Sequence, residues 1–354
     1  MKSSYPVSHC ITRLFVVLAV VAGLGFSGAA PKAFGQSQTG FTYNGMAYIS
    51  YSSNEYLETP QGPNGVAAMA ATGANYATVL VTQYVSGPTS NTIAANGSTP
   101  TDPDVIAAIT NLQQQGIKVA LKPHVDSLDA AHTWRGQFAP TNTAAWFASY
   151  QTFIVHYATI AQAQGADVFV IGCELKTLSG SAYASNWTTI INAVRAVYTG
   201  PITYAANASG SNDEFDSVSF WDQLDLIGVD GYFPLTNHAD PTVAQLVSAW
   251  NTAAGNKNGF APETELHNLQ LAHPSLPLIF TEIGYPSAAG SNEAPYNYSP
   301  TGSYDPSEQQ DCYEAFFEVF SLDSSWVKGV FWWAWSVSPP VTDDLGYSPQ
   351  NKLA

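Results

Sequence analysis

Eight short apolar runs, separated by helical patterns, constrain the fold more than any other feature of this sequence. Nearly continuous apolar runs of this length are typical of parallel strands that are covered on both faces. They occupy residues 46–50, 76–81, 117–123, 167–174, 201–207, 224–233, 277–284 and 328–335. The helical patterns cover residues 61–72, 102–116, 143–164, 183–198, parts of 241–272, and 306–323. Repeated β/α alternation without a break in composition predicts an α/β fold, a single-domain (β/α)8 TIM barrel.

An open, doubly wound sheet is the alternative arrangement of such elements. That fold should show a glycine-rich phosphate loop after an early strand, and this chain has none. Only 19 residues follow Trp335, so the last helix of the barrel should be short or missing. We expect one barrel domain over residues 36–354.

The N-terminus has the features of an export signal. Lys2 and Arg13 precede an apolar run over residues 14–26, and small residues follow it up to Gly35. This order of basic, apolar and small residues predicts a secretory signal peptide over residues 1–35. The run is short for a membrane span, so we expect cleavage, and no membrane association after it. The predicted location is extracellular or periplasmic.

Composition narrows the class of partner. Acidic residues outnumber basic ones by 27 to 11, giving a net charge of −16, whereas nucleic acid and anionic membranes require a basic face. The 9 Trp and 19 Tyr favour surfaces that stack on sugar-like ligands, although a bulky core accounts for part of them. Cys173 and Cys312, which remain after the signal, are expected to be free thiols because two cysteines make no disulfide framework.

Two glutamates stand where a barrel places its chemistry. Glu174 ends the fourth apolar run and Glu282 ends the seventh. The carboxyl ends of barrel strands meet at one mouth, so the two side chains should converge there. Retaining glycoside hydrolysis uses two carboxylates about 5–5.5 Å apart, one as acid/base and one as nucleophile. The alternative is a structural ion pair, for example of Glu174 with Lys176 or Lys122.

Several stretches of this chain together resemble glycoside hydrolase family 113, a family of retaining (β/α)8 barrels. The resemblance covers roughly residues 41–351. Its matching stretches are LKPHVD, WRGQF, WFASYQTFIVHYA, FVIGCELK, ITYAAN, DLIGVDGYFPL, IFTEIGYPS and GVFWWAW. It implies endo-β-1,4-mannanase activity, with Glu174 as acid/base and Glu282 as nucleophile.

The chain departs from the wider clan beside the acid/base. An asparagine that hydrogen-bonds the substrate 2-hydroxyl usually precedes that glutamate, whereas Cys173 precedes Glu174 here. A thiol is a weak donor, so another group must make this contact. Asn207, at the end of the fifth run, is the candidate.

Aromatic residues follow the sixth run and fill the eighth. Tyr232 is expected to donate to Glu282 and help keep it ionised; a rim aromatic is the alternative. By the two-residue alternation of a strand, Trp333 and Trp335 share one face and Trp332 takes the other. One of the first two should be a sugar platform, with core packing as the alternative.

Polar residues of the third run complete the predicted mouth. Lys122, His124 and Asp126 alternate along that run, and we expect these three side chains to hydrogen-bond sugar hydroxyls. The sequence offers no further convergent ligand beside them, so neither a metal nor a cofactor is expected.

Three further residues complete the candidate site. Trp134 and Arg135 are expected to flank a sugar subsite, with a salt bridge as the equal alternative for Arg135. Asp230 is expected to orient Tyr232 or bind sugar, or to cap a turn.

These observations predict a secreted, monomeric, retaining glycoside hydrolase that cuts β-1,4-linked mannan internally. Its partner is a β-linked polysaccharide or oligosaccharide. Two alternatives stay open: hydrolysis of another β-linked glycan, such as glucan or xylan, and a barrel that binds polysaccharide without cleaving it. The presence of both glutamates argues against the second.

Overall fold

The computed structural model describes residues 40–58, 61–321, 323 and 325–352. The predicted signal peptide, residues 1–35, lies outside this part of the chain.

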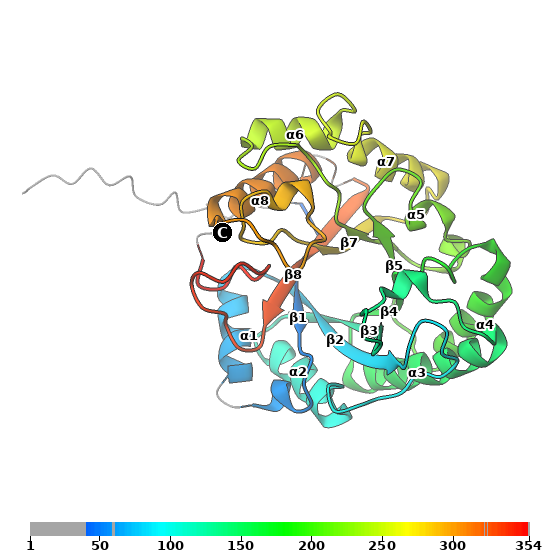
Figure 1. Cartoon of the computed structure of the whole chain (residues 1–354). Helices are drawn as coiled ribbons and strands as arrows, with labels where there is room; N and C mark the ends of the chain where they lie inside the picture. The colour runs from blue at the N-terminus through cyan, green and yellow to red at the C-terminus, as the bar shows by residue number, and fades with distance from the viewer. Residues whose placement is uncertain (1–39, 59–60, 322, 324, 353–354) are drawn as a thin grey trace, which may run out of the picture. The chain divides into compact units, whose positions relative to one another are not determined.

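Eight parallel strands close into a barrel in sequence order, with β8 paired to β1 (Figure 1). Each of the eight apolar runs forms one strand, which confirms the predicted fold class. The strands are β1 (Tyr43–Ile49), β2 (Tyr76–Val85), β3 (Lys118–Ser127), β4 (Val168–Cys173), β5 (Ile202–Ala208), β6 (Ile227–Gly231), β7 (Leu278–Ile283) and β8 (Val327–Ser336).

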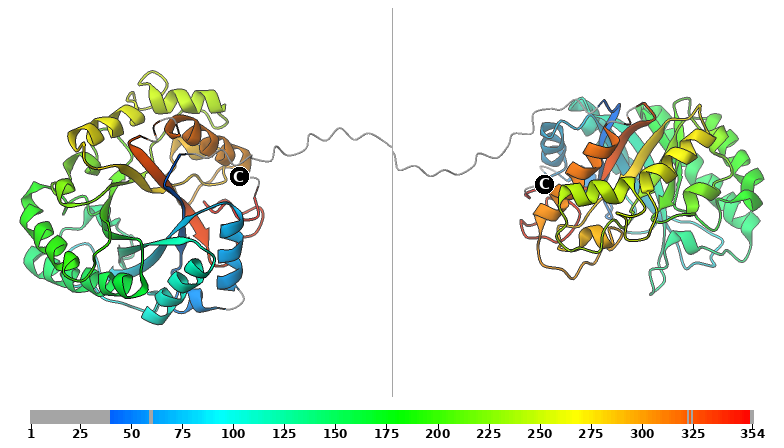
Figure 2. Two further views of the ribbon diagram at one scale, coloured as in Figure 1. Left: turned by 180° about the vertical axis from the view of Figure 1, so that it is seen from behind. Right: turned by 90° about the horizontal axis from the view of Figure 1, so that it is seen from above.

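Helices surround the barrel, as Figures 1 and 2 show. They are α1 (Gln61–Ala71), α2 (Asp102–Gln114), α3 (Thr143–Gln164), α4 (Ala184–Arg195), α5 (Glu214–Ser217), α6 (Val243–Asn251), α7 (Pro262–Ala272) and α8 (Pro306–Phe320). The connection from β5 to β6 contains only the short α5 and a 3-10 turn, whereas two helices connect β6 to β7. After β8 the described residues form no helix, as expected from the few residues that remain.

The helix ends follow local sequence signals. The Asn142 side chain accepts a hydrogen bond from the Ala145 amide and so caps the start of α3. Gly165 ends α3 with φ of 67°, a left-handed conformation that glycine adopts without steric penalty. α2 begins after Thr101, which accepts from the Asp104 amide, and has Pro103 in its first turn.

The apolar side chains fall into two main layers. The larger cluster joins the outer faces of the strands to the helices, and its largest fully buried members include Trp146, Trp187, Trp221 and Trp250. A small separate cluster contains Tyr76, Val168 and Phe331 with three neighbours near the beginnings of other strands. This cluster lies toward the amino ends of the strands, whereas the buried Glu174, Asp230 and Glu282 lie at the carboxyl ends of theirs.

Two features bear on the environment of the protein. Cys173 and Cys312 are both buried free thiols, as predicted. No helix among the described residues combines the length and hydropathy needed to cross a lipid bilayer.

Candidate active site

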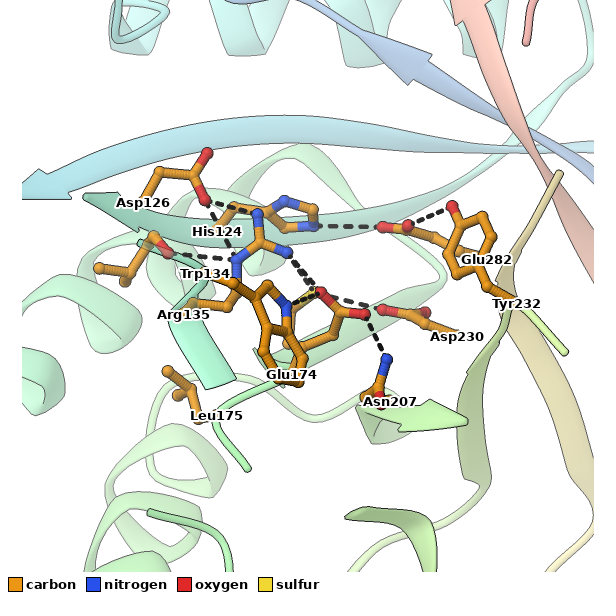
Figure 3. A network of polar contacts seen from close by, with 12 residues as sticks. His124, Asp126, Trp134, Arg135, Glu174, Leu175, Asn207, Asp230, Tyr232 and Glu282 are labelled. Atoms are coloured by element: carbon orange, nitrogen blue, oxygen red, sulfur yellow. Dashed lines mark hydrogen bonds and ion pairs between the residues drawn. The ribbon is translucent and has the colours of Figure 1, made fainter. Parts of the chain in front are cut away.

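Glu282 lies near the end of β7 and is almost fully buried, with 5% of its surface exposed. The ammonium of Lys122 on β3 is 2.6 Å from its Oε1. The hydroxyl of Tyr232, just after β6, donates to its Oε2 at 2.8 Å (Figure 3). The predicted contact between Tyr232 and Glu282 is therefore present. One cation and one hydroxyl thus hold this carboxylate in a single orientation.

Glu174 is the first residue after β4 and has different partners. Trp134 Nε1 and Arg135 Nη1 both donate to its Oε2 at 3.0 Å, and Asn207 Nδ2 donates to Oε1 at 3.2 Å. Figure 3 shows Trp134 and Arg135 on one side of the carboxylate and Asn207 on the other. The alternative ion pairs of Glu174 with Lys122 or Lys176 are absent, because Lys122 binds Glu282 and Lys176 Nζ lies 2.6 Å from Asp213.

Arg135 connects the third and fourth strands. It begins the 3-10 turn η2 (Arg135–Gln137), and its Nη2 and Nε donate to Asp126 Oδ1 at 2.5 and 3.1 Å. Its Nη1 also lies 3.4 Å from Cys173 Sγ. The salt-bridge alternative for Arg135 is therefore present, and its partners include the predicted acid/base itself. Trp134 uses its indole N–H on Glu174 yet leaves 36% of its surface exposed.

Lys122 and Asp230 form an ion pair beneath Glu282. Lys122 Nζ lies 3.0 and 3.1 Å from the two oxygens of Asp230, and neither residue has exposed surface. Asp230 also accepts from Thr281 Oγ1 at 2.7 Å and from Cys173 Sγ at 3.3 Å. Lys122 is fully buried and its ammonium already contacts both carboxylates, so a direct contact of Lys122 with sugar hydroxyls stays a prediction. Asp230 is thus the countercharge of Lys122, and its hydrogen bonds go to Lys122, Thr281 and Cys173 rather than to Tyr232.

Burial dominates the electrostatics of Glu282. Desolvation raises the pKa of its carboxyl to about 7, and the nearby Asp230 and Glu174 carboxylates act in the same direction. The charge and hydrogen bond of Lys122 lower this pKa but do not cancel the effect of burial. Burial therefore outweighs the hydrogen bonds that favour the ionised form of Glu282.

His124 presents unused nitrogen atoms to the barrel mouth. Neither ring nitrogen has a hydrogen-bond partner among the described residues, although the side chain is 1% exposed. Nε2 lies 3.5 Å from Glu282 Oε1, which is too long for a normal hydrogen bond. Burial, with the charges of Arg135 and Lys122, lowers the pKa of His124 well below its usual value, so the ring is neutral. A neutral imidazole can both donate to and accept from a hydroxyl.

The tryptophans of β8 correct one prediction. Trp332 packs on Tyr313 and Phe316 of α8, as expected for the helix-facing side. Trp335, however, donates its indole N–H to Gly65 O of α1 at 3.0 Å, so it also faces the helices.

Trp333 alone among these three reaches the His124 ring, lying parallel to it with the ring centres 6.3 Å apart. Trp335 does not share the face of Trp333 because the pairing of β8 with β1 shifts register in this stretch. Met46 of β1 pairs with Trp332 and Tyr48 with Trp335, so two steps on β1 match three on β8. The extra residue reverses the alternation of side chains after that point. The Trp333–Ala334 peptide bond in this stretch is cis.

Two residues near the site were not predicted from the sequence. Tyr347, in the segment after β8, places its ring 6.3 Å from that of Tyr232 and donates to Pro295 O at 2.5 Å. Glu214 begins α5, is fully buried, and accepts from the amide of Asn207 at 2.8 Å. Neither follows an apolar run at a strand end, which is the signal that identified the other residues.

Two groups of side chains have donor atoms close enough to surround a cation. Within each group these atoms lie within 4.8 Å of one another; the groups are His124, Cys173 and Glu282, and Cys173, Glu174 and Asp230. The fold thus supplies convergent donors that the sequence did not reveal. The ammonium of Lys122 already binds Glu282 and Asp230, however, and a divalent ion would have to displace it. The donor set therefore fits a metal poorly.

The chain is similar to proteins of one glycoside hydrolase family. The profile of Glycoside Hydrolase Family 113 matches residues 46–346. The GH113 β-mannanase AaManA from Alicyclobacillus acidocaldarius, in complex with ManMIm, is 27% identical, with a TM-score of 0.75 over 88% of this chain and 94% of that chain. A GH113 β-1,4-mannanase complex is 25% identical, with a TM-score of 0.74 and coverages of 88% and 94%.

A β-glucuronidase from Ruminococcus gnavus shares the fold alone. It is 12% identical, with a TM-score of 0.54 over 87% of this chain and 47% of that chain. A search among curated protein sequences found no match.

Proposed function

This chain belongs to glycoside hydrolase family 113, and from that premise we propose that it hydrolyses internal β-1,4-mannosidic bonds of mannan-type polysaccharides with retention of configuration. One observation carries the proposal. Two buried carboxylates, Glu174 and Glu282, lie at the carboxyl ends of β4 and β7 and have different hydrogen-bonding partners.

Glu282 is proposed as the nucleophile. Its Oε1 contacts the ammonium of Lys122, and its Oε2 accepts from Tyr232. A cation and a hydroxyl donor both stabilise the ionised form, which is the form that attacks a sugar carbon.

Glu174 is proposed as the acid/base. Residues around the mouth, including the partly exposed Trp134, orient its carboxyl, so that a glycosidic oxygen can approach it. His124 and Trp333 are proposed to bind the sugar whose bond is cut. The unpartnered nitrogens of His124 suit its hydroxyls, and the indole face of Trp333 suits its apolar C–H face.

The reaction proceeds in two displacements. In the first, Glu174 gives its proton to the glycosidic oxygen while Glu282 attacks the anomeric carbon, so the bond to the leaving sugar breaks and a glycosyl ester forms. In the second, Glu174 takes a proton from a water molecule, the water oxygen attacks the anomeric carbon, and Glu282 leaves. Two inversions give net retention, and both carboxyls return to their starting protonation states.

The test combines substrate range with stereochemistry. We expect reducing ends and short oligosaccharides to appear from mannan, with much slower release from β-glucan and xylan. Proton NMR of early hydrolysis should show the β-anomer first. An α-anomer formed first would contradict retention, and faster hydrolysis of glucan or xylan would contradict mannan as the substrate.

A further inference from the structure

Glu214 is a buried acid that lies behind the candidate active site. It begins α5 in the connection from β5 to β6 and has no exposed surface. The Tyr204 hydroxyl donates to its Oε1 at 2.5 Å, and the Asn207 amide donates to its Oε2 at 2.8 Å. Both donors belong to β5, so this carboxyl holds the end of that strand.

Two routes lead from Glu214 to Glu174. The Tyr204 oxygen accepts a hydrogen bond from the amide of Leu175, the residue that follows Glu174, at 2.8 Å. The side chain of Asn207 donates to Glu174 Oε1 at 3.2 Å. Figure 3 shows Leu175 and Asn207 beside Glu174. One buried carboxyl thus supports both the backbone and the side chain of the proposed acid/base.

The backbone at Glu174 requires such support. Glu174 has φ of 50°, in the left-handed region that residues other than glycine adopt uncommonly. β4 ends one residue earlier, at Cys173, so the direction of the Glu174 side chain depends on the turn that follows the strand. The neighbouring pair of Lys176 and Asp213, 2.6 Å apart, fastens the same turn to the residue that precedes Glu214.

We propose that Glu214 is a positioning residue that, through Tyr204 and Asn207, aims Glu174 at the glycosidic oxygen. This inference rests on the proposed function of the two glutamates. Glu214 does not contact the substrate. It acts through Tyr204, which binds the Leu175 amide, and through Asn207, which binds the Glu174 carboxylate.

The charge state of Glu214 agrees with this role. Burial raises its pKa to about 8, and the Glu174 carboxylate adds to the rise, while the hydrogen bonds from Tyr204 and Asn207 lower it. At neutral pH the group is therefore mostly uncharged and does not repel Glu174. A glutamine at this position keeps an acceptor for the Asn207 amide and has no charge at any pH.

The experiment compares two aryl β-mannosides in the full-length enzyme. Phenol is a poor leaving group that needs protonation by Glu174, whereas 2,4-dinitrophenol leaves without it. For Glu214→Ala and Tyr204→Phe we expect kcat/KM on the phenyl substrate to fall by about 10- to 100-fold, because a misdirected acid loses part of the roughly 10²- to 10⁴-fold that general acid catalysis supplies. On the dinitrophenyl substrate the loss should stay within about threefold. Glu214→Gln should lie between wild type and Glu214→Ala on the phenyl substrate.

Asp104→Asn is the matched control. Asp104 is also a fully buried carboxylate; it accepts from the Leu57 amide at 2.8 Å and holds a loop on α2. Its loss should lower the melting temperature without changing the ratio of the two kcat/KM values.

The outcomes separate this inference from the proposed function. If every Glu214 and Tyr204 variant loses activity equally on both substrates, Glu214 is merely structural and the positioning role is overturned. If Glu214→Ala fails to fold, Tyr204→Phe decides, because it keeps the ring that packs on Trp187 and Phe220. A wild-type enzyme that is inactive on both mannosides and on mannan would overturn the proposed function and this inference with it.

Discussion

At the scale of single residues, Glu174 and Glu282 each contact a different basic side chain. Lys122 is a fully buried ammonium on a strand, and its two carboxylate partners are Asp230 and Glu282. Arg135 lies in the loop after β3 and divides its guanidinium between Asp126 and Glu174. Glu282 is held by a residue on a rigid strand, which suits a nucleophile that must attack one carbon. Glu174 is held by a residue in a loop, which suits a group that exchanges a proton with substrate and water.

Substitution of each glutamate tests these roles. Glu282→Ala should abolish turnover of every substrate, because no glycosyl ester can form. Glu174→Ala should retain much more activity on substrates with activated leaving groups, and added azide should raise its rate by attacking the intermediate. The azide product from Glu174→Ala should be the β-linked glycosyl azide. If Glu282→Ala instead gives that product with azide, the two roles are exchanged.

The pH dependence follows from the pKa of Glu282. Attack requires the ionised carboxylate, and burial raises the pKa of this group to about 7. We therefore expect kcat/KM to fall by about tenfold per pH unit on the acid side, with the fall beginning near neutrality. Tyr232→Phe removes a donor to the ionised form, so this pKa should rise and the acid limb should move to higher pH.

A pH–rate profile of wild type and Tyr232→Phe measures this shift. Tyr313→Phe is a suitable control, because the Tyr313 hydroxyl is buried without a hydrogen-bond partner among the described residues. Full activity of Tyr232→Phe with an unmoved acid limb would remove Tyr232 from the mechanism.

At the scale of elements, β8 determines which tryptophan faces the sugar. Trp333→Ala should lower kcat/KM on mannan by about 10- to 100-fold, which corresponds to losing roughly 1–3 kcal/mol of apolar contact. Its melting temperature should change little, because Trp333 is only partly buried and faces the mouth.

Trp332→Ala and Trp335→Ala provide the controls for this prediction. Both side chains pack against helices, so truncation should destabilise the fold by about 3–5 kcal/mol. The protein that remains folded should keep its kcat/KM. Thermal melting beside kinetics separates the two effects. Loss of activity in folded Trp335→Ala would restore the original expectation that Trp335 faces the substrate.

At the scale of the whole molecule, export and assembly stay predictions. Expression in a secreting host should yield a mature chain that begins at Gln36, because small residues precede the expected cleavage after Gly35. N-terminal sequencing and intact mass measure this. Light scattering on the mature protein should give the mass of one chain. A product that keeps residues 1–35 after secretion would contradict the signal-peptide prediction, and a dimer mass would contradict the monomer.

The sequence by itself determined the barrel and its two central carboxylates. Eight apolar runs separated by helices allow few other folds, since each run must be covered on both faces. Glu174 and Glu282 were identifiable because a barrel brings the carboxyl ends of its strands to one mouth, wherever those strands lie in the chain. These inferences need only local pattern and strand order.

The contact of Tyr232 with Glu282 was predicted from the sequence, whereas tertiary structure alone decided the other partners of the two carboxylates. Lys122 contacts Asp230 and Glu282 across 108 and 160 positions, and no local pattern connects residues so far apart. The faces of Trp333 and Trp335 depend on a register shift against β1, and the two-residue alternation holds only while the ladder is regular. Glu214 supports Glu174 through hydrogen bonds to β5, so its place could not be read from a loop sequence. The pattern of apolar residues in a strand indicates which side chains are buried. Which buried polar side chains become partners depends on which atoms the closed barrel brings within hydrogen-bonding distance.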